Sequence, residues 1–254
     1  MIQSLERAFG ILQILAEKPE THRGLAEIAD RIGLNRSTCA NLLKTLVGLG
    51  YAEQAAPRRG YIPGPMVYYL ARSGPYRKDI ISPARPILAK LAHSLSETAL
   101  IATFRMGKRF VLCQVDGNSV LTVRDEYLLR DDIYKTSTGR LLIASLSGEE
   151  LASFVQLNGL PDNTWPGVRS LEDLKRELAV IAREKIVVTP GPTIGIAVPI
   201  FEDRSIVAAL GVFLPSSRFD KRRKTAIIAE MRRTAGELTA IFSHNKGVSI
   251  GTQS

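Results

Sequence analysis

The sequence predicts an α+β protein built from two domains, and three observations support this prediction. The chain has 254 residues, of which 45% are hydrophobic, enough to fill two cores. Residues 4–62 show helical apolar spacing and then two short strand-like runs, whereas residues 85–242 mix strand-like and helical runs. Glycine and proline interrupt the chain between these regions, at Gly64-Pro65 and Ser73-Gly74-Pro75. We therefore expect a helical N-terminal domain and a C-terminal α/β sandwich with an antiparallel sheet.

The N-terminal region begins with two predicted helices. Ser4 is placed to accept backbone N–H bonds as the N-cap of the first helix, and Lys18-Pro19 ends that helix. Its apolar residues recur at helical spacing: Leu5, Ala8, Phe9, Leu12 and Leu15. The second helix is shorter and stops at Gly33, and its apolar stripe consists of Leu25, Ile28, Ala29 and Ile32.

The third predicted helix has one polar face that carries no acid. Asn35 is its expected N-cap, and Gly48 and Gly50 close it. Its inward side is expected to hold the apolar residues Cys39, Leu42, Leu43, Leu46 and Val47. The opposite side carries Ser37, Ala40, Asn41 and Lys44 at spacings of three and four, with Arg36 and Thr38 in the first turn.

A short helix, a tight turn and a second helix of this kind form the arrangement that places a recognition helix in the DNA major groove. Arg36 can pair with phosphate or guanine, and Asn41 can bond to an adenine edge. Ser37 and Thr38 suit contacts to phosphate. This stretch alone also fits a solvated face on an ordinary helical bundle, so the residues that follow must decide.

The residues that follow predict a β-hairpin. Residues 51–54 and 60–62 are strand-like, and the loop at 55–59 between them carries Arg58 and Arg59. Two arginines at a hairpin tip suit phosphate or minor-groove contact, although such a pair can also serve only as solubilising charge. Three helices followed by a basic hairpin predict a winged helix-turn-helix DNA-binding domain over residues 1–64.

The C-terminal region is expected to mix helices with strands. A helical stripe runs through residues 88–95, and strand-like runs follow at 99–104, 110–115 and 120–123. Helical stripes return at 141–146, 149–157 and 171–184, the last capped by Ser170. Two further strands, 196–201 and 207–214, flank a turn at Asp203-Arg204, and a long helix at 221–242 closes the region. The polar tail at 245–254 is expected to be disordered.

Charge and composition narrow the function classes. The formal net charge of +9 favours acidic partners such as nucleic acid or anionic metabolites. The sequence opens with no secretory leader and has only two cysteines, both in apolar runs, so we expect a cytoplasmic protein with no membrane span. The three histidines lie far apart and at no metal-ligand spacing, and no metal site or cofactor is expected.

Four N-terminal stretches are specific when taken together: SLERAFGILQILAE at 4–17, LAEIADRIGLNRST at 25–38, NLLKTLVGLGY at 41–51 and YIPGP at 61–65. They resemble the DNA-binding domain of the isocitrate lyase regulator (IclR) family of bacterial transcription factors. The C-terminal region is similar to that family's effector-binding domain, on looser motifs: RPILAKLAHSLSETALIATF at 85–104, TSTGRLLIA at 136–144 and IAVPIFEDRSIVAALGVFLPSSRF at 196–219.

This resemblance implies a domain plan and partners. Residues 65–81 would form a linker helix and connection that contributes to dimer contacts, and residues 82–244 a GAF-like effector-binding domain. The partners implied are an operator in double-stranded DNA, a small-molecule effector and further copies of the chain in a homodimer or homotetramer. Repression is commoner than activation in the family, so a repressor is the expected role.

The resemblance also marks a ligand pocket, in which this chain departs from the family. The family's pocket positions match Ser137, Thr138, Gly195, Gly211 and Phe213. The family often has cysteine in place of Gly195 and serine in place of Gly211 and Phe213, so several side-chain donors are missing here. Backbone N–H groups at the helix start of Ser137, Thr138 and Gly139 suit a carboxylate, although this stretch also fits an ordinary helix cap.

Three readings of the function remain open from the sequence. The first is a sequence-specific repressor controlled by a small organic acid, aromatic or otherwise bulky because the pocket is more apolar than usual. The second is a regulator whose degenerate pocket holds no ligand. The third, an enzyme acting on a small acid, lacks a nucleophile with a base, a phosphate-binding glycine loop and a metal set. A basic cluster at 218–224 fits a second nucleic-acid contact, a solvated patch or an intersubunit patch.

Overall fold

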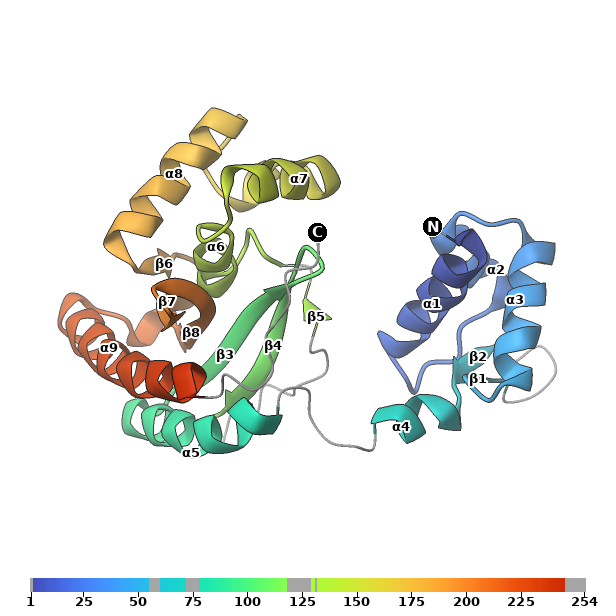
Figure 1. Cartoon of the computed structure of the whole chain (residues 1–254), viewed down its shortest axis with the longest axis horizontal. Helices are drawn as coiled ribbons and strands as arrows, with labels where there is room; N and C mark the ends of the chain where they lie inside the picture. Colours follow the sequence, from blue (N-terminus) through green and yellow to red (C-terminus); the bar gives the residue numbers. More distant parts are fainter. Residues whose placement is uncertain (1, 55–59, 72–77, 118–128, 131, 245–254) are drawn as a thin grey trace. The chain divides into compact units, whose positions relative to one another are not determined.

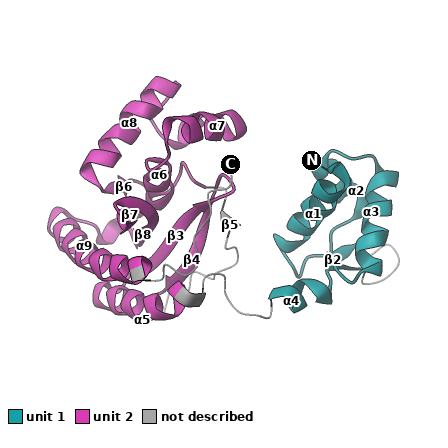
Figure 2. Ribbon diagram, in the orientation of Figure 1, with its two compact units in different colours: residues 1–75 teal, residues 76–254 magenta. Residues whose placement is uncertain are grey.

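The computed structural model describes residues 2–54, 60–71, 78–117, 129–130 and 132–244. The chain divides into two compact units, residues 1–75 and 76–254, which are coloured separately in Figure 2. The domain boundaries expected from the sequence, after residues 64 and 81, lie on either side of this division. Each unit has its own hydrophobic core, so each is described by itself below.

The first unit has the element order expected of a winged helix-turn-helix (Figure 1). Its elements are α1 (Gln3–Ala16), α2 (Leu25–Ile32), α3 (Arg36–Gly48), β1 (Ala52–Gln54), β2 (Tyr61–Pro63) and α4 (Pro65–Ala71). Strands β1 and β2 pair antiparallel, with Glu53 opposite Ile62. The predicted hairpin strands are therefore confirmed.

The core of the first unit confirms helices two and three and corrects helix one. Nine buried residues make this core: Ile11, Ile14, Leu15, Ile28, Ala29, Cys39, Leu43, Leu46 and Ala52. The predicted stripe of α1 is wrong for Leu5 and Phe9, which are 53% and 62% exposed, because the buried residues of α1 all lie in its second half. Ser4 is not the N-cap, because the helix already begins at Gln3 with Ile2 before it.

The second unit is an α/β sandwich with a mixed order of elements. In chain order these are α5 (Lys78–Leu95), β3 (Thr98–Arg105), β4 (Lys108–Val115), β5 (Leu129–Arg130), α6 (Ser137–Ile143), α7 (Gly148–Asn158), η1 (Asp162–Thr164), α8 (Leu171–Glu184), β6 (Val187–Thr189), β7 (Thr193–Glu202), β8 (Ser205–Pro215), η2 (Ser216–Arg218) and α9 (Lys221–His244). The predicted strand at 120–123 lies outside the described residues, and the short strands β5 and β6 were not predicted.

One antiparallel sheet organises the second unit. Its strand order is β5-β4-β3-β8-β7-β6, and every neighbouring pair runs antiparallel. Helices α5 and α9 pack on one face of the sheet, while α6, α7 and α8 cover the other (Figure 1). The expected sandwich with an antiparallel sheet is confirmed.

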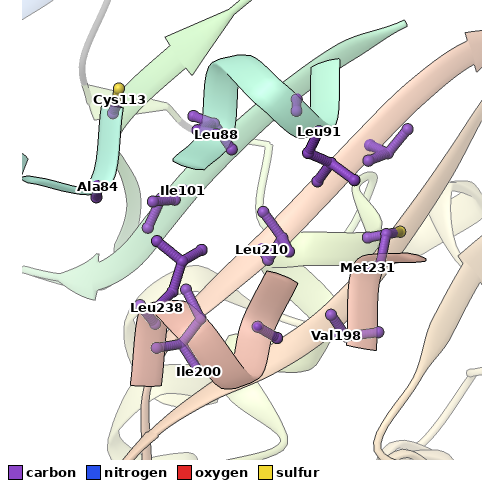
Figure 3. Close-up of a cluster of buried hydrophobic side chains, with 14 of the residues drawn as sticks. Ala84, Leu88, Leu91, Ile101, Cys113, Val198, Ile200, Leu210, Met231 and Leu238 are labelled. Atoms are coloured by element: carbon purple, nitrogen blue, oxygen red, sulfur yellow. The ribbon is translucent and has the colours of Figure 1, made fainter. Parts of the chain in front are cut away.

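Two cores, one on each face of the sheet, hold the second unit together. Figure 3 shows the larger one, in which Leu88 and Leu91 of α5 meet Ile101, Val198 and Leu210 of the sheet beside Met231 and Leu238 of α9. Each fully buried side chain of this size contributes about 1.5–3 kcal/mol through the apolar surface it removes from water. Successive side chains of a strand point to opposite faces of the sheet. Ile101 of β3 therefore faces this core, whereas Leu100 and Ala102 face the other core, under α6.

Two absences apply only to the residues that the structure describes. Among them, no helix combines the length and apolar character that crossing a bilayer requires. The same residues contain no cluster of three or more histidine, cysteine, aspartate or glutamate side chains arranged to hold a metal ion.

Candidate nucleic-acid interface and ligand site

The side chain of Asn35, the residue before α3, caps the first turn of this helix. The Asn35 Oδ1 accepts a hydrogen bond from the Thr38 backbone N–H at 2.8 Å and from the Ser37 hydroxyl at 2.8 Å. A cap of this kind stabilises a helix by about 1 kcal/mol. The predicted N-cap is confirmed, and it fixes the start of the helix at Arg36.

The two faces of α3 separate as the sequence predicts except at Val47, which was expected on the inward side and is 37% exposed, because it lies at the end of the helix beyond the last core residue, Leu46. Cys39, Leu43 and Leu46 are buried, and burial raises the pKa of the Cys39 thiol, as expected of a core cysteine rather than a reactive one. On the opposite side, four polar residues are exposed: Arg36, Ser37, Asn41 and Lys44. Thr38 and Ala40 are half-buried at the edges of this face. No acid occurs anywhere in α3, so the face presents only neutral and positive groups.

The turn before α3 is made possible by Gly33. This residue ends α2 in the left-handed region, at φ 68°, which glycine adopts at no steric cost. Its N–H bonds back to the carbonyls of Ala29 and Asp30. The chain thus turns within the few residues between α2 and α3, and the polar face of α3 is exposed to solvent.

A buried arginine joins the hairpin to the helices. The Arg23 backbone N–H donates to the Tyr61 carbonyl at 3.0 Å, and the Tyr61 N–H donates to the Arg23 carbonyl at 2.8 Å, which adds a third chain segment beside β2. The Arg23 guanidinium forms ion pairs with Glu17, at the end of α1, and with Glu27 in α2. Arg23 therefore links both helices through its side chain and the hairpin through its backbone. A side chain at Gly60 would place its Cβ 2.7 Å from the Arg23 carbonyl oxygen, so this close approach requires glycine. Sequence reasoning did not single out Arg23. Its pair with Glu27 has the local i,i+4 spacing, but its backbone pairing with Tyr61 spans distant parts of the chain and has no local signal.

The tip of the hairpin, with Arg58 and Arg59, lies outside the described residues. The structure therefore describes the strands that support these two arginines and nothing of the arginines themselves.

The expected ligand residues of the second unit come together on the α6 face of the sheet. Backbone pairing aligns one residue from each of four adjacent strands in a row: Thr189, Gly195, Phe213 and Thr98. The next row contains Ala197, Gly211 and Leu100. The two glycines leave a hollow in the sheet surface, over which α6 places Ser137 and Thr138.

The ring of Phe213 fills much of this hollow. A Cβ at Gly195 would lie 2.8 Å from the Ser137 Oγ and 3.2 Å from the Phe213 ring, and a Cβ at Gly211 would lie 2.5 Å from a Thr138 methyl carbon. Ser137 and Thr138 are fully buried, and their hydroxyls have no hydrogen-bond partner among the described residues. The family's pocket positions are thus adjacent in space but closely packed.

Helix α6 is fixed by contacts at its start. Thr136, not Ser137, is the N-cap, and its hydroxyl accepts a bond from the Gly139 N–H at 3.2 Å. A Cβ at Gly139 would lie 2.1 Å from the Ile133 carbonyl oxygen, so packing alone demands glycine there. Arg140 donates to the Tyr134 carbonyl at 2.8 Å and lies 4.2 Å above the Trp165 ring, and its burial lowers the pKa of its guanidinium to about 10.

An open cavity of about 480 Å³ lies beside this row. Leu100, Val111, Phe213 and Leu214 give it apolar walls, and Arg109, Asp132 and Thr136 bring polar groups to it. The volume lies within the range of about 300–1,000 Å³ that small-molecule sites occupy. The cavity is built from β3, β4, β8 and the loop before α6, so its walls come from segments far apart in sequence.

An ion pair and an ion triad contribute charged groups to this cavity, and sequence reasoning found neither of them. The Arg109 guanidinium binds Asp132 with two hydrogen bonds, Nε to Oδ1 at 2.8 Å and Nη2 to Oδ2 at 2.6 Å. Glu97, whose side chain is 1% exposed, accepts from Arg218 at 2.6 Å and from Arg223 at 2.7 Å. Burial raises the pKa of Glu97, and the two arginines oppose this rise. Two members of the basic cluster at 218–224 therefore have a structural partner.

Both units match models of known protein families. Residues 4–56 match the IclR helix-turn-helix domain, and residues 76–240 match the bacterial transcriptional regulator IclR C-terminal domain. This chain belongs to the IclR family. Its membership confirms the resemblance found in the sequence and makes the protein a DNA-binding transcriptional regulator rather than an enzyme.

Curated IclR relatives match almost the whole chain. The transcriptional regulator KdgR of Escherichia coli is 24% identical over 249 residues, which cover 96% of this chain and 94% of that protein. The transcriptional repressor AllR of the same organism is 27% identical over 245 residues, covering 93% and 89%.

Solved IclR structures share the fold. An IclR family regulator of Brucella abortus superimposes with a TM-score of 0.77 at 20% identity, covering 94% of this chain and 92% of that one. An IclR homologue of Microbacterium hydrocarbonoxydans, complexed with 4-hydroxybenzoate, gives a TM-score of 0.72 at 22% identity, covering 94% and 98%. At these identities the likeness shows the fold alone.

Proposed function

We propose that this IclR family protein is a repressor that reads a pseudo-palindromic operator and is controlled by a small organic or aromatic acid. The single observation that supports operator reading best is the exposed, acid-free face of α3, formed by Arg36, Ser37, Asn41 and Lys44. DNA carries negative charge along its whole length, so a face without acids meets no repulsion there. Repression is supported by the similarity to AllR, which is named a repressor.

In this proposal the residues of α3 have separate roles. Arg36 pairs with a phosphate or with the edge of a guanine, and Asn41 bonds to an adenine edge. Ser37 and Thr38 contact phosphate, Ala40 packs against a base or sugar, and Lys44 adds a phosphate contact. Arg58 and Arg59 would neutralise further phosphates beside the major groove.

The proposed protein acts as a homodimer or homotetramer, because a two-fold operator requires two recognition helices. Apolar side chains that the first unit leaves exposed support self-association: Leu5 and Phe9 on α1, and Tyr68 and Leu70 on α4. Sedimentation at micromolar concentration measures the oligomer, and a monomer would contradict this part of the proposal. Action on chromosomal DNA implies a cytoplasmic location.

Control by an acid is supported by the cavity in the second unit and by the 4-hydroxybenzoate bound to the Microbacterium homologue. In this proposal Ser137, Thr138, Gly139, Gly195, Gly211 and Phe213 form the deep wall of the effector site. Isothermal titration with a panel of small organic and aromatic acids tests it. If none of the acids binds, the pocket of the second unit holds no small acid, and the protein is not regulated by one.

A gel shift on the promoter DNA next to the protein's own coding region tests operator reading. We expect a complex that survives excess unrelated DNA and weakens as salt rises, since binding releases condensed counterions. The variant with both Arg58→Ala and Arg59→Ala should bind all DNA more weakly, with a shallower dependence on salt. A control that removes one exposed arginine from the second unit, Arg169→Ala, should change neither property. If unrelated DNA competes equally well with the promoter fragment, the protein is not a regulator of that promoter.

A further inference from the structure

The cavity in the second unit contains a buried hydrogen-bond donor that no described residue satisfies. Arg109 lines this cavity and is 5% exposed. Its Nε and Nη2 are both used by Asp132, whereas its Nη1 is buried and has no partner among the described residues. A buried N–H group without a partner costs free energy, so an acceptor placed against Nη1 would gain that energy on binding.

The charges around the cavity favour one negative group. In the ion pairs that the described residues form here, three arginines, Arg109, Arg218 and Arg223, face two carboxylates, Asp132 and Glu97, which is an excess of one positive charge. Both oxygens of Glu97 are already engaged by arginine, and so are both oxygens of Asp132. Two buried N–H groups of these arginines have no partner among the described residues, the Arg109 Nη1 and the Arg218 Nε. Arg109 is the more deeply buried of the two, with 6% of its side chain exposed against 34% for Arg218, so its unpaired donor costs more free energy.

Phe213 lies against the two glycines of the family pocket positions and also lines the open cavity. The Phe213 ring lies against Gly195 and Gly211, in front of the buried hydroxyls of Ser137 and Thr138. The same residue forms a wall of the open cavity on the side of β3 and β4. A ligand in the open cavity therefore meets the aromatic ring before it can reach either hydroxyl.

We infer that Arg109 is the carboxylate-binding residue of this chain and that its ligand is a monocarboxylic acid with a compact apolar body. The carboxylate accepts from Nη1, and the apolar body packs against Leu100, Val111 and Phe213. This inference rests on the proposed function, that the second unit binds a small acid, and it adds the residue and the charge class. Asp132 has a different role: it holds the guanidinium in place and does not touch the ligand.

The charges on the cavity wall also disfavour a second carboxylate on the ligand. The wall includes the carboxylates of Asp132 and Glu97. A second negative charge would exceed the one excess positive charge of these ion pairs and would be repelled by the two carboxylates. We therefore expect benzoate and 4-hydroxybenzoate to bind more tightly than phthalate.

The test is isothermal titration of the full chain with four probes: benzoate, 4-hydroxybenzoate, phthalate and the neutral isostere 4-hydroxybenzamide. We expect at least one of the two monocarboxylates to bind, with the amide at least about ten-fold weaker, because a charged acceptor strengthens the bond to arginine. If neither monocarboxylate binds, or if the amide binds as tightly as the acid, the inference is wrong.

Variants separate ligand binding from a purely structural ion pair. Arg109→Gln should weaken acid binding by about ten- to hundred-fold, as expected for the loss of a charge-assisted contact. Asp132→Asn keeps the shape of the partner and one of the two hydrogen bonds that position the guanidinium, and it removes a competing negative charge, so acid affinity should stay equal or rise. Arg105→Gln is the matched control on β3: its guanidinium donates to the Phe104 carbonyl and does not line the cavity, so its acid affinity should equal that of the wild type.

A merely structural role of Arg109 predicts the opposite pattern. Removing either half of the ion pair would then lower acid binding equally, and that result would overturn the inference. Circular dichroism identifies a variant that does not fold; in that event Asp132→Asn and the acid–amide comparison on the wild type still decide. If the protein binds its operator but no acid, this inference is wrong and the proposed regulatory role still stands. If it binds the acid but no operator, this inference stands and the proposed regulatory role is wrong.

Discussion

At the scale of single residues, Phe213 limits the depth of the proposed effector site. Its ring occupies the hollow above Gly195 and Gly211, a space that those two residues leave open because they lack side chains. If the proposed site binds acids, the ring would confine larger ones to the outer cavity, which Arg109 also lines. The ring of Phe213 can pack in this position because Gly195 and Gly211 have no Cβ atoms.

Phe213→Ala should join the outer cavity to this hollow. We expect the affinity for 2-naphthoate relative to benzoate to rise at least about ten-fold, because a bulkier ring can fill the vacated space. The half-buried ring also contributes to stability, and its loss should lower the free energy of unfolding by about 1–3 kcal/mol. Isothermal titration and urea unfolding measure the two effects. An unchanged preference between the two acids would show that the ring does not limit the site.

Gly139 should tolerate no side chain. A Cβ on Gly139 would lie 2.1 Å from the backbone oxygen of Ile133. The side chain of Arg140 in α6 donates a hydrogen bond to the carbonyl of Tyr134, which follows Ile133, so Ile133 cannot move away from the helix freely. Gly139→Ala should lower the free energy of unfolding by about 2–4 kcal/mol, measured by urea denaturation. Gly236→Ala is the control: it lies exposed within α9 with nothing near its Cβ position, and it should stabilise the protein by about 1 kcal/mol.

The residues of the candidate ligand site were only partly accessible from the sequence. Ser137, Thr138, Gly195, Gly211 and Phe213 followed from a family resemblance, which assigns positions without showing how they pack. The Arg109–Asp132 pair spans 23 positions and the Glu97–Arg218 pair spans 121. No local spacing reveals such partners, because the fold alone brings them together.

At the scale of elements, α3 is where sequence and structure agree most closely. Its cap, its stop and its two faces all follow from local rules: an asparagine before the first turn, glycines at the end and apolar residues at helical spacing. The sequence misjudged α1 because spacing shows which residues share a face and does not show how far along the helix its neighbours extend. Leu5 and Phe9 belong to the apolar stripe and still lie outside the core.

Arg36→Ala and Asn41→Ala should each weaken operator binding by about 1–3 kcal/mol while leaving binding to unrelated DNA nearly unchanged for Asn41→Ala. Both residues are exposed, and the core side of α3 does not depend on them, so thermal stability should stay close to that of the wild type. Fluorescence anisotropy with operator and scrambled duplexes measures this difference. Operator affinity equal to that of the wild type in both variants would mean that another face of the unit reads DNA.

At the scale of the whole molecule, regulation requires that a ligand in the second unit and DNA on the first unit change each other's binding. An acid can alter operator affinity only to the extent that it binds the DNA-competent and DNA-incompetent states differently. Such coupling is a property of two binding equilibria, so it can be tested without knowledge of the motion that links the units.

Thermodynamic linkage makes this test strict. If a saturating acid lowers operator affinity by some factor, typically about 5–150-fold, a saturating operator duplex must lower acid affinity by the same factor. Anisotropy gives the first factor and isothermal titration gives the second. Arg109→Gln should keep the operator affinity of the acid-free protein and lose the response to acid, whereas Arg105→Gln should keep both. Unequal factors in the wild type would mean that the acid acts outside a single linked equilibrium, because reciprocity holds for any mechanism in which one protein population binds both partners.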